Sequence, residues 1–257
     1  MDDGKKIIAE TVAAERISLL KVPLDIVAPE QLEDLVYEFL KDKKDHDVVL
    51  CSLWDLLKAR RNGEYRSFIQ RTSLVVPISK SIVSGARFLL RKKLYRYMPF
   101  DFVISLLSIL EKREYSVYLL GGKMRILKRA EKNIRQTFPR LRIVGRFVGS
   151  FKHQEEQTIL EAIRKAAPSL LLVGKGVKGG ERWIARNGAS LGGGLRLWCS
   201  DLFDIFAERR RRPSRAVFER GFEWIGFCFR KPWRFFRIVP YIYYKLLLCI
   251  YRLFKLY

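Results

Sequence analysis

Short apolar runs that alternate with helical stretches most constrain the fold of this 257-residue chain. Each run is four or five residues long and rich in Val, Leu or Ile. Strands this short and this continuously apolar are typical of a parallel sheet that helices cover on both faces. The predicted strands are 47–51, 73–77, 116–120, 141–144, 169–173 and 195–198. Helices are predicted after residue 51 and at 102–112, 124–138 and 155–166. We therefore expect an α/β fold.

The segment 209–257 combines basic and aromatic side chains, and this composition sets it apart from the core predicted at 1–208. It opens with four consecutive arginines, and only two acids follow them. Cations beside interfacial aromatic rings suit an anionic membrane leaflet. We interpret 238–257, which Pro240 and three cations interrupt, as a helix lying in the plane of that interface. The alternative is a helix that docks on the core or on another subunit.

A formal net charge of +23 implies an anionic partner, which is nucleic acid, lipid headgroups or a phosphorylated substrate. Nucleic acid is disfavoured, because apolar and aromatic residues interleave the basic segment and the sequence carries no nucleic-acid module. The four cysteines form no CxxC pair, which suits a reducing compartment and predicts no metal site. His46 and His153 are isolated and are predicted to lie on the surface. An apolar leader is missing from the first residues, so a secretory signal is not expected.

Two glycine turns follow predicted strands and are candidates for phosphate binding. Gly121 and Gly122 end one strand, and Gly174 and Gly176 end another. Ligands of open parallel sheets bind at the carboxyl ends of the strands, where glycine lets the backbone approach a phosphate. Neither turn matches the dinucleotide fingerprint or a P-loop. The alternative is that these glycines are ordinary loop residues.

Several segments, taken in their order along the chain, carry a family resemblance. They are 22–25, 119–122, 138–145, 149–151, 170–176, 181–187, 203–205, 212–213, 222–224 and 232–234. Together with Arg96 and Asp101, they resemble the WecG/TagA/CpsF glycosyltransferases from about Val22 to Arg237. The resemblance implies a Rossmann-like parallel sheet flanked by helices, followed by a basic, aromatic, helical appendage that binds the membrane.

The resemblance also implies an activity. Such enzymes transfer an N-acetylhexosamine, typically N-acetylmannosamine, from a UDP-sugar to a polyprenyl-diphosphate-linked sugar in cell-surface polysaccharide synthesis. They invert the anomeric carbon, need no metal or other cofactor, and work as peripheral proteins on the cytoplasmic face of the membrane. The resemblance further implies association into a homo-oligomer, of a number that the sequence does not fix.

Site residues follow from the resemblance by position. The residues implied to bind the nucleotide-sugar are Arg96, Gly121, Gly122, Gly174, Gly176 and Glu181. Arg212, Arg234 and Arg237 correspond to arginines that hold the lipid diphosphate, because a guanidinium forks onto phosphate oxygens. For these three arginines the alternative is nonspecific contact with lipid.

The chain departs from the family where the chemistry is expected. Ile78 stands in place of the aspartate implied to be the catalytic base, and 178–181 lacks the amide expected to contact substrate. One hypothesis is a divergent glycosyltransferase with another base, for which Asp101 is the first candidate and Asp204 and Glu181 are further acids. Helix capping is the alternative role of Asp101 and Asp204. The other hypothesis is a catalytically silent relative, which acts as a membrane-bound partner subunit of a glycan assembly complex.

Overall fold

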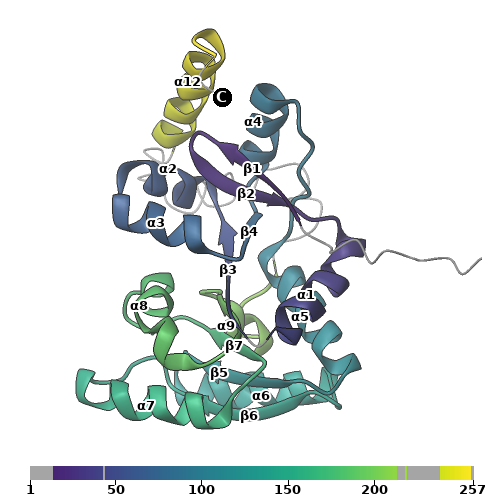
Figure 1. Cartoon of the computed structure of the whole chain (residues 1–257). Helices are drawn as coiled ribbons and strands as arrows, with labels where there is room; N and C mark the ends of the chain where they lie inside the picture. Colours follow the sequence, from purple (N-terminus) through teal and green to yellow (C-terminus); the bar gives the residue numbers. More distant parts are fainter. Residues whose placement is uncertain (1–13, 43, 213–217, 219–237, 256–257) are drawn as a thin grey trace, which may run out of the picture.

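A six-stranded parallel sheet forms the centre of the computed structural model, which describes residues 14–42, 44–212, 218 and 238–255 (Figure 1). The strands, in their order across the sheet, are β4 (Leu74–Pro77), β3 (Asp45–Cys51), β8 (Gly194–Trp198), β7 (Leu170–Val173), β5 (Ser116–Leu120) and β6 (Arg142–Phe147). Every neighbouring pair is parallel. The α/β fold and all six predicted strands are confirmed.

Burial explains why the strands are so short and apolar. All four residues of β4 and of β7 are buried, because each strand has a helical layer on both sides. The edge strand β6 instead alternates between exposed and half-buried residues. Successive residues of one strand point into different cores, as Val48 and Val49 of β3 show.

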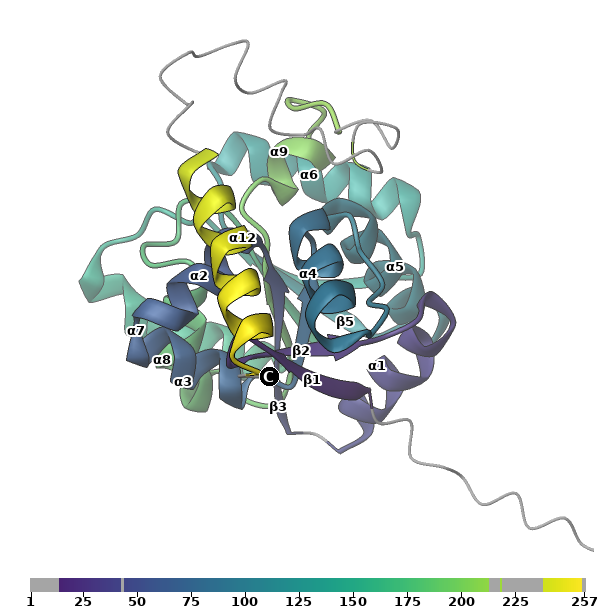
Figure 2. The ribbon, with the colours of Figure 1, turned by 90° about the horizontal axis from the view of Figure 1, so that it is seen from above.

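Two helical layers, the α5 face and the α8 face, cover the two sides of the sheet. The α5 face carries α1 (Leu32–Lys41), α5 (Pro99–Lys112), α6 (Met124–Thr137) and α9 (Leu202–Phe206). The α8 face carries α2 (Leu53–Arg61), α3 (Gly63–Arg71), α7 (His153–Ala166) and α8 (Glu181–Leu191). A short 3-10 helix, Pro29–Gln31, precedes α1. The arrangement is a three-layer, Rossmann-like sandwich (Figure 2).

An antiparallel hairpin that the sequence did not predict lies beside β4. Its strands are β1 (Glu15–Leu19) and β2 (Val22–Ile26), and its turn residues Leu20 and Lys21 have φ of 53° and 67°. Neither is Gly, Asn or Asp, so the usual hairpin signal is missing. Buried Asp25 joins the hairpin to the sheet. It pairs with Arg16 at 2.7 Å, and its Oδ2 accepts a hydrogen bond from the Val75 amide at 2.6 Å.

His46 is buried, so its predicted place on the surface is wrong. Its ring stacks on Phe39 with centroids 4.4 Å apart, because the end of α1 covers the start of β3. The ring nitrogens are hydrogen-bonded to Ser73 Oγ at 3.0 Å and to Asp42 Oδ1 at 2.8 Å. His153, by contrast, has a fully exposed side chain, as predicted.

The helix α12 (Ile238–Leu253) packs against α2 and against α4 (Lys80–Leu90), as Figure 2 shows. It buries Tyr244, Leu247, Leu248 and Tyr251. Gly85 of α4 makes this contact possible, since a Cβ there would lie 1.9 Å from the Tyr244 hydroxyl. The docking alternative is therefore confirmed for this helix.

Among the described residues, no helix combines the length and the hydropathy needed to cross a bilayer. Most of the segment between Arg212 and α12 lies outside the described residues. The membrane-binding role of 209–257 and the boundary at residue 208 stay predictions.

Candidate functional site

The two predicted glycine turns lie side by side at the carboxyl ends of β5 and β7, but their amides are engaged within the protein. Gly121, Gly122 and Gly174 donate their N–H groups to the carbonyls of Phe147, Lys175 and Leu120. A Cβ on Gly121 would lie 2.8 Å from the backbone of Gly174. Glycine is required here because two loops touch. A phosphate-binding role for these turns stays a prediction, with three of its amides already occupied.

Gly176 serves the same packing. It adopts φ +103°, and a Cβ there would lie 3.3 Å from Gly149 in the loop after β6. The loops that follow β5, β6 and β7 thus pack closely against one another at the carboxyl ends of these strands. The helices that begin from these loops are held in fixed positions.

Glu181 is the first residue of α8 and lies in a small polar cluster against α2 and α3. The hydroxyl of Tyr65, from α3, donates a hydrogen bond of 2.5 Å to Glu181 Oε2. Tyr65 is only 2% exposed, so its ring is held firmly. Burial and the negative charge of Asp55 raise the pKa of Glu181 to about 7, although Tyr65 and Lys58 oppose the shift.

The neighbours of Glu181 are fixed by contacts of their own. Asp55 Oδ2 accepts hydrogen bonds from the Ser52 amide at 2.9 Å and the Ser52 hydroxyl at 2.5 Å, which caps α2. The Lys58 ammonium lies 3.7 Å from the centroid of the Tyr65 ring. Burial raises the pKa of the Cys51 thiol, which therefore stays protonated. Glu181 Oε1, by contrast, makes no hydrogen bond with any described residue.

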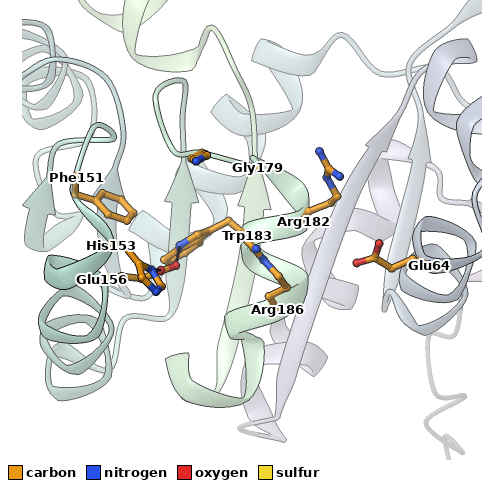
Figure 3. Close-up of a pocket in the computed structure, with 9 residues that line it drawn as sticks. Glu64, Phe151, His153, Glu156, Gly179, Arg182, Trp183 and Arg186 are labelled. Atoms are coloured by element: carbon orange, nitrogen blue, oxygen red, sulfur yellow. Dashed lines mark hydrogen bonds and ion pairs between the residues drawn. The ribbon is translucent and has the colours of Figure 1, made fainter.

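A pocket of about 470 Å³ opens next to this cluster (Figure 3). Phe151, His153 and Glu156 line one side and Glu64 the other, with residues of α8 between them. The remaining lining residues are Lys178, Gly179, Arg182, Trp183 and Arg186. Apart from Glu64 of α3, the lining residues come from the loops and the first two helical turns after β6 and β7, so the pocket lies near the carboxyl ends of these strands, where parallel sheets bind ligands.

The pocket carries an excess of positive charge. Lys178, Arg182 and Arg186 form no ion pair with any residue that the structure describes. Glu156 is already occupied, because it accepts hydrogen bonds from the Trp183 indole at 2.7 Å, from Asn187 and from His153. Burial opposes its ionisation, but these donors outweigh burial and lower the pKa of Glu156. The free cations make the pocket suitable for an anion.

Other residues predicted for the site lie apart from this pocket. Asp101 is in the first turn of α5, so it belongs to the opposite face of the sheet from Glu181. The Arg212 guanidinium lies 4.4 Å from the ring centroid of Phe100, beside Asp101 in the sequence. Asp204 is in α9, also on the α5 face. Arg234 and Arg237 lie outside the described residues.

Arg96 and Ile78 meet at the carboxyl end of β4. The Arg96 Nε donates to the Ile78 carbonyl at 3.0 Å, and its guanidinium lies 3.6 Å from the centroid of the Phe218 ring. The Ile78 amide donates to the Cys51 carbonyl at 3.0 Å, and its side chain packs against the apolar core of the α5 face. The end of β4 thus presents an apolar side chain instead of an acid.

Sequence reasoning missed two parts of the site. Arg182 and Arg186 are four residues apart, which places them on one face of α8, and this spacing was available as a signal. Tyr65 was not detectable, because 116 residues separate it from Glu181. Only the packing of α3 against α8 brings the two together.

Comparisons of the sequence with known proteins identify its family. The model of the Glycosyl transferase WecG/TagA/CpsF family matches residues 17–256. The chain belongs to this family. The resemblance found in the sequence is therefore confirmed, and the family is one of glycosyltransferases.

Two relatives carry the same name, N-acetylglucosaminyldiphosphoundecaprenol N-acetyl-beta-D-mannosaminyltransferase. The protein from Bacillus subtilis (strain 168) is 21% identical over 188 residues, which is 73% of each chain. The protein from Staphylococcus aureus (strain NCTC 8325 / PS 47) is 19% identical over 218 residues, which is 82% of this chain and 83% of the relative.

Proposed function

We propose that this protein transfers an N-acetylhexosamine of the N-acetylmannosamine type from a UDP-sugar to a polyprenyl-diphosphate-linked sugar in cell-surface polysaccharide synthesis. The names of the relatives support this substrate pair, since each contains an N-acetylmannosaminyl group and a diphosphoundecaprenol acceptor. Within the structure, the observation that supports it best is the pocket at α8, whose three cations have no ion-pair partner among the described residues.

This pocket is the proposed site of the nucleotide diphosphate. Arg182 and Arg186 lie on one face of α8, within its first two turns, and the positive end of the helix dipole adds to their charge. Guanidinium groups bind phosphate oxygens through two parallel hydrogen bonds. The Phe151 and Trp183 rings give the same pocket an apolar wall for the uracil ring of the UDP-sugar. As a diphosphate leaves, these cations neutralise its developing charge, which is how the transfer proceeds without a metal.

The proposed acceptor is a lipid, so the protein has to work at a membrane surface, and α12 offers a suitable face. Opposite its docked side, α12 exposes a row of large apolar residues. They are Val239, Ile242, Tyr243, Leu246, Ile250 and Leu253, and exposed Phe254 follows directly after the helix. Lys245, Arg252 and Lys255 are exposed along the same segment, as anionic headgroups would favour. We place the protein on the cytoplasmic face of the membrane, where UDP-sugars are made.

Arginines of the C-terminal segment are proposed to hold the lipid diphosphate. Arg212 already lies against the first turn of α5, and Arg234 and Arg237 follow in the sequence. Arg96, bound to the end of β4 and stacked on Phe218, links this segment to the sheet. Self-association remains part of the proposal, with no number of subunits assigned.

One observation favours a second function. The Ile78 side chain fills the end of β4 with apolar surface, where the family resemblance implies a catalytic aspartate. A silent relative that binds the same membrane and a partner transferase has no need of a base there. This second function predicts binding of UDP or of lipid without sugar transfer.

The test separates the two functions. Purified protein is incubated with UDP-N-acetylmannosamine, or with a panel of other UDP-sugars, and with a short-chain polyprenyl-diphosphate-linked N-acetylglucosamine. Transfer is measured by mass spectrometry of the lipid product, and UDP binding by calorimetry. We expect a single sugar to be added and UDP to be released in equal amount. Binding without transfer or UDP release for any donor would favour the silent partner.

A further inference from the structure

We propose that Glu181 is the general base of the transfer, and that Tyr65 positions its carboxylate. This inference rests on the proposed function. It assigns to α8 the proton-accepting role that the end of β4, with Ile78 in place, does not provide.

The half-buried carboxylates around the site differ in how many of their oxygens already accept hydrogen bonds. Asp55 already accepts hydrogen bonds from the Ser52 amide and hydroxyl, in the capping box of α2. Glu156 accepts three hydrogen bonds from His153, Trp183 and Asn187. In Glu181 one oxygen is fixed by Tyr65, while Oε1 has no hydrogen-bond partner among the described residues. Among these half-buried carboxylates, Glu181 is therefore the one with an oxygen left to accept a proton from a substrate, whereas Glu64, which also lines the pocket, is exposed.

Position supports the same assignment. Gly179 and Arg182, which flank Glu181 in sequence, both line the cationic pocket, and so does Glu64, the neighbour of Tyr65. The Glu181 carboxylate therefore lies next to the proposed diphosphate site, although Glu181 is not itself one of the residues that line the pocket. The Tyr65 ring is buried and its hydroxyl is 2.5 Å from Oε2, so the carboxylate has a defined orientation. A base held in one orientation needs little reorganisation to accept a proton.

The charged groups around Glu181 keep its ionisation close to neutral pH. Asp55 and Lys58 face it from α2, Tyr65 from α3, and Cys51 from the end of β3. Burial and Asp55 raise the pKa of Glu181 to about 7, against the effects of Tyr65 and Lys58. A carboxylate of this basicity accepts a proton more readily than an ordinary glutamate does, while still being substantially ionised near pH 7.

The step balances without a further reactant. The acceptor hydroxyl oxygen forms a bond to the anomeric carbon of the donor sugar. The bond from that carbon to the diphosphate oxygen breaks, and UDP leaves with the electron pair. The hydroxyl proton passes to Glu181 Oε1 and then to solvent. Lys178, Arg182 and Arg186 balance the charge of the departing UDP.

The first test compares Glu181→Gln with the wild type, with Glu161→Gln on the exposed surface of α7 as the matched control. Glutamine keeps an acceptor for the Tyr65 hydroxyl but does not take up a proton near neutral pH. We expect Glu181→Gln to lower kcat by about 10² to 10⁴-fold, the range of general-base catalysis. UDP affinity should change by less than about threefold, and the control should match the wild type.

The second test uses the pH profile of kcat, because a merely structural role would leave it unmoved. Tyr65→Phe removes a hydrogen bond that favours the ionised carboxylate, so the acidic limb should move to higher pH. Asp55→Asn removes a negative neighbour, so the limb should move to lower pH. An active wild type with undiminished transfer in Glu181→Gln would overturn this assignment alone. A wild type inactive with every donor would overturn the proposed function, and the assignment with it.

Discussion

Burial of Glu181 beside Asp55 predicts that the wild-type protein loses stability as the pH rises, and that Glu181→Gln does not share this loss. The folded protein raises the pKa of Glu181 from its ordinary value of 4.5 to about 7. The folded state therefore holds the proton more tightly than the unfolded state does. The stabilisation that comes from this tighter proton binding is complete below pH 4.5 and is lost as the pH rises through 7.

The magnitude follows from the same difference. At about 1.4 kcal/mol for each pH unit between the two pKa values, the full effect is about 3 kcal/mol. The Glu181 side chain is half-buried, so solvent screens part of this effect and we expect about 2 kcal/mol. In a chain of this size, that free energy corresponds to about 4–8 °C in Tm. Relative to the wild type, Glu181→Gln should thus gain several degrees in Tm between pH 5 and pH 8.

Thermal unfolding of both proteins, followed by circular dichroism at pH 5, 6, 7 and 8, gives the measurement. The difference in Tm between variant and wild type cancels the other titrating groups that the two proteins share. The Glu161→Gln control, on the exposed surface of α7, should show no such trend. A Tm difference that is independent of pH would refute the argument, since it would mean that Glu181 ionises as easily in the folded protein as in the unfolded chain.

Two further predictions concern the pocket and α12. The double variant Arg182→Ala with Arg186→Ala should bind UDP about 10- to 100-fold more weakly by calorimetry, because two charge-assisted contacts are lost. Alanine at Arg125, an exposed arginine of α6, should have no effect, and an equal loss there would indicate nonspecific charge. Leu246→Glu, on the exposed face of α12, should lower binding to vesicles of phosphatidylglycerol at least tenfold in cosedimentation, whereas Met124→Glu, a similarly exposed apolar site on α6, should not. Equal binding by both would contradict a membrane role for α12.

Ionised Glu181 lowers the stability of the folded protein, and a cost of this kind is common for residues that serve catalysis. The polar cluster around Glu181 holds a carboxylate in a place where its ionised form is disfavoured. Such arrangements persist where they serve chemistry, because a tight network of neighbours holds them in place. The capping contacts of Asp55 and the buried ring of Tyr65 are the parts of this network that the structure shows.

The resemblance and the structure divide the proposed site differently. The resemblance implies ligand contacts by the two glycine turns, by Arg96 and Glu181, and by the C-terminal arginines Arg212, Arg234 and Arg237. The structure shows that the amides of Gly121, Gly122 and Gly174 hold neighbouring loops together. It also shows a cationic pocket at the start of α8, formed in part by Arg182 and Arg186, and the roles of the predicted site residues stay predictions. The position of the site at the carboxyl ends of the strands is common to both.

The sequence by itself determined the central sheet and the family of this protein. Runs such as 170–173 are apolar at every position, because helices cover both faces of a parallel strand, and that pattern is visible in the residues alone. The tertiary structure decided the hairpin at 15–26, the burial of His46 and the pairing of Tyr65 with Glu181. In each case the deciding contact joins groups through packing or an unusual turn, and local sequence patterns carry no record of it. The Tyr65–Glu181 pair shows this most clearly, since 116 residues separate the two in the sequence and only the tertiary fold brings the Tyr65 hydroxyl to the Glu181 carboxylate.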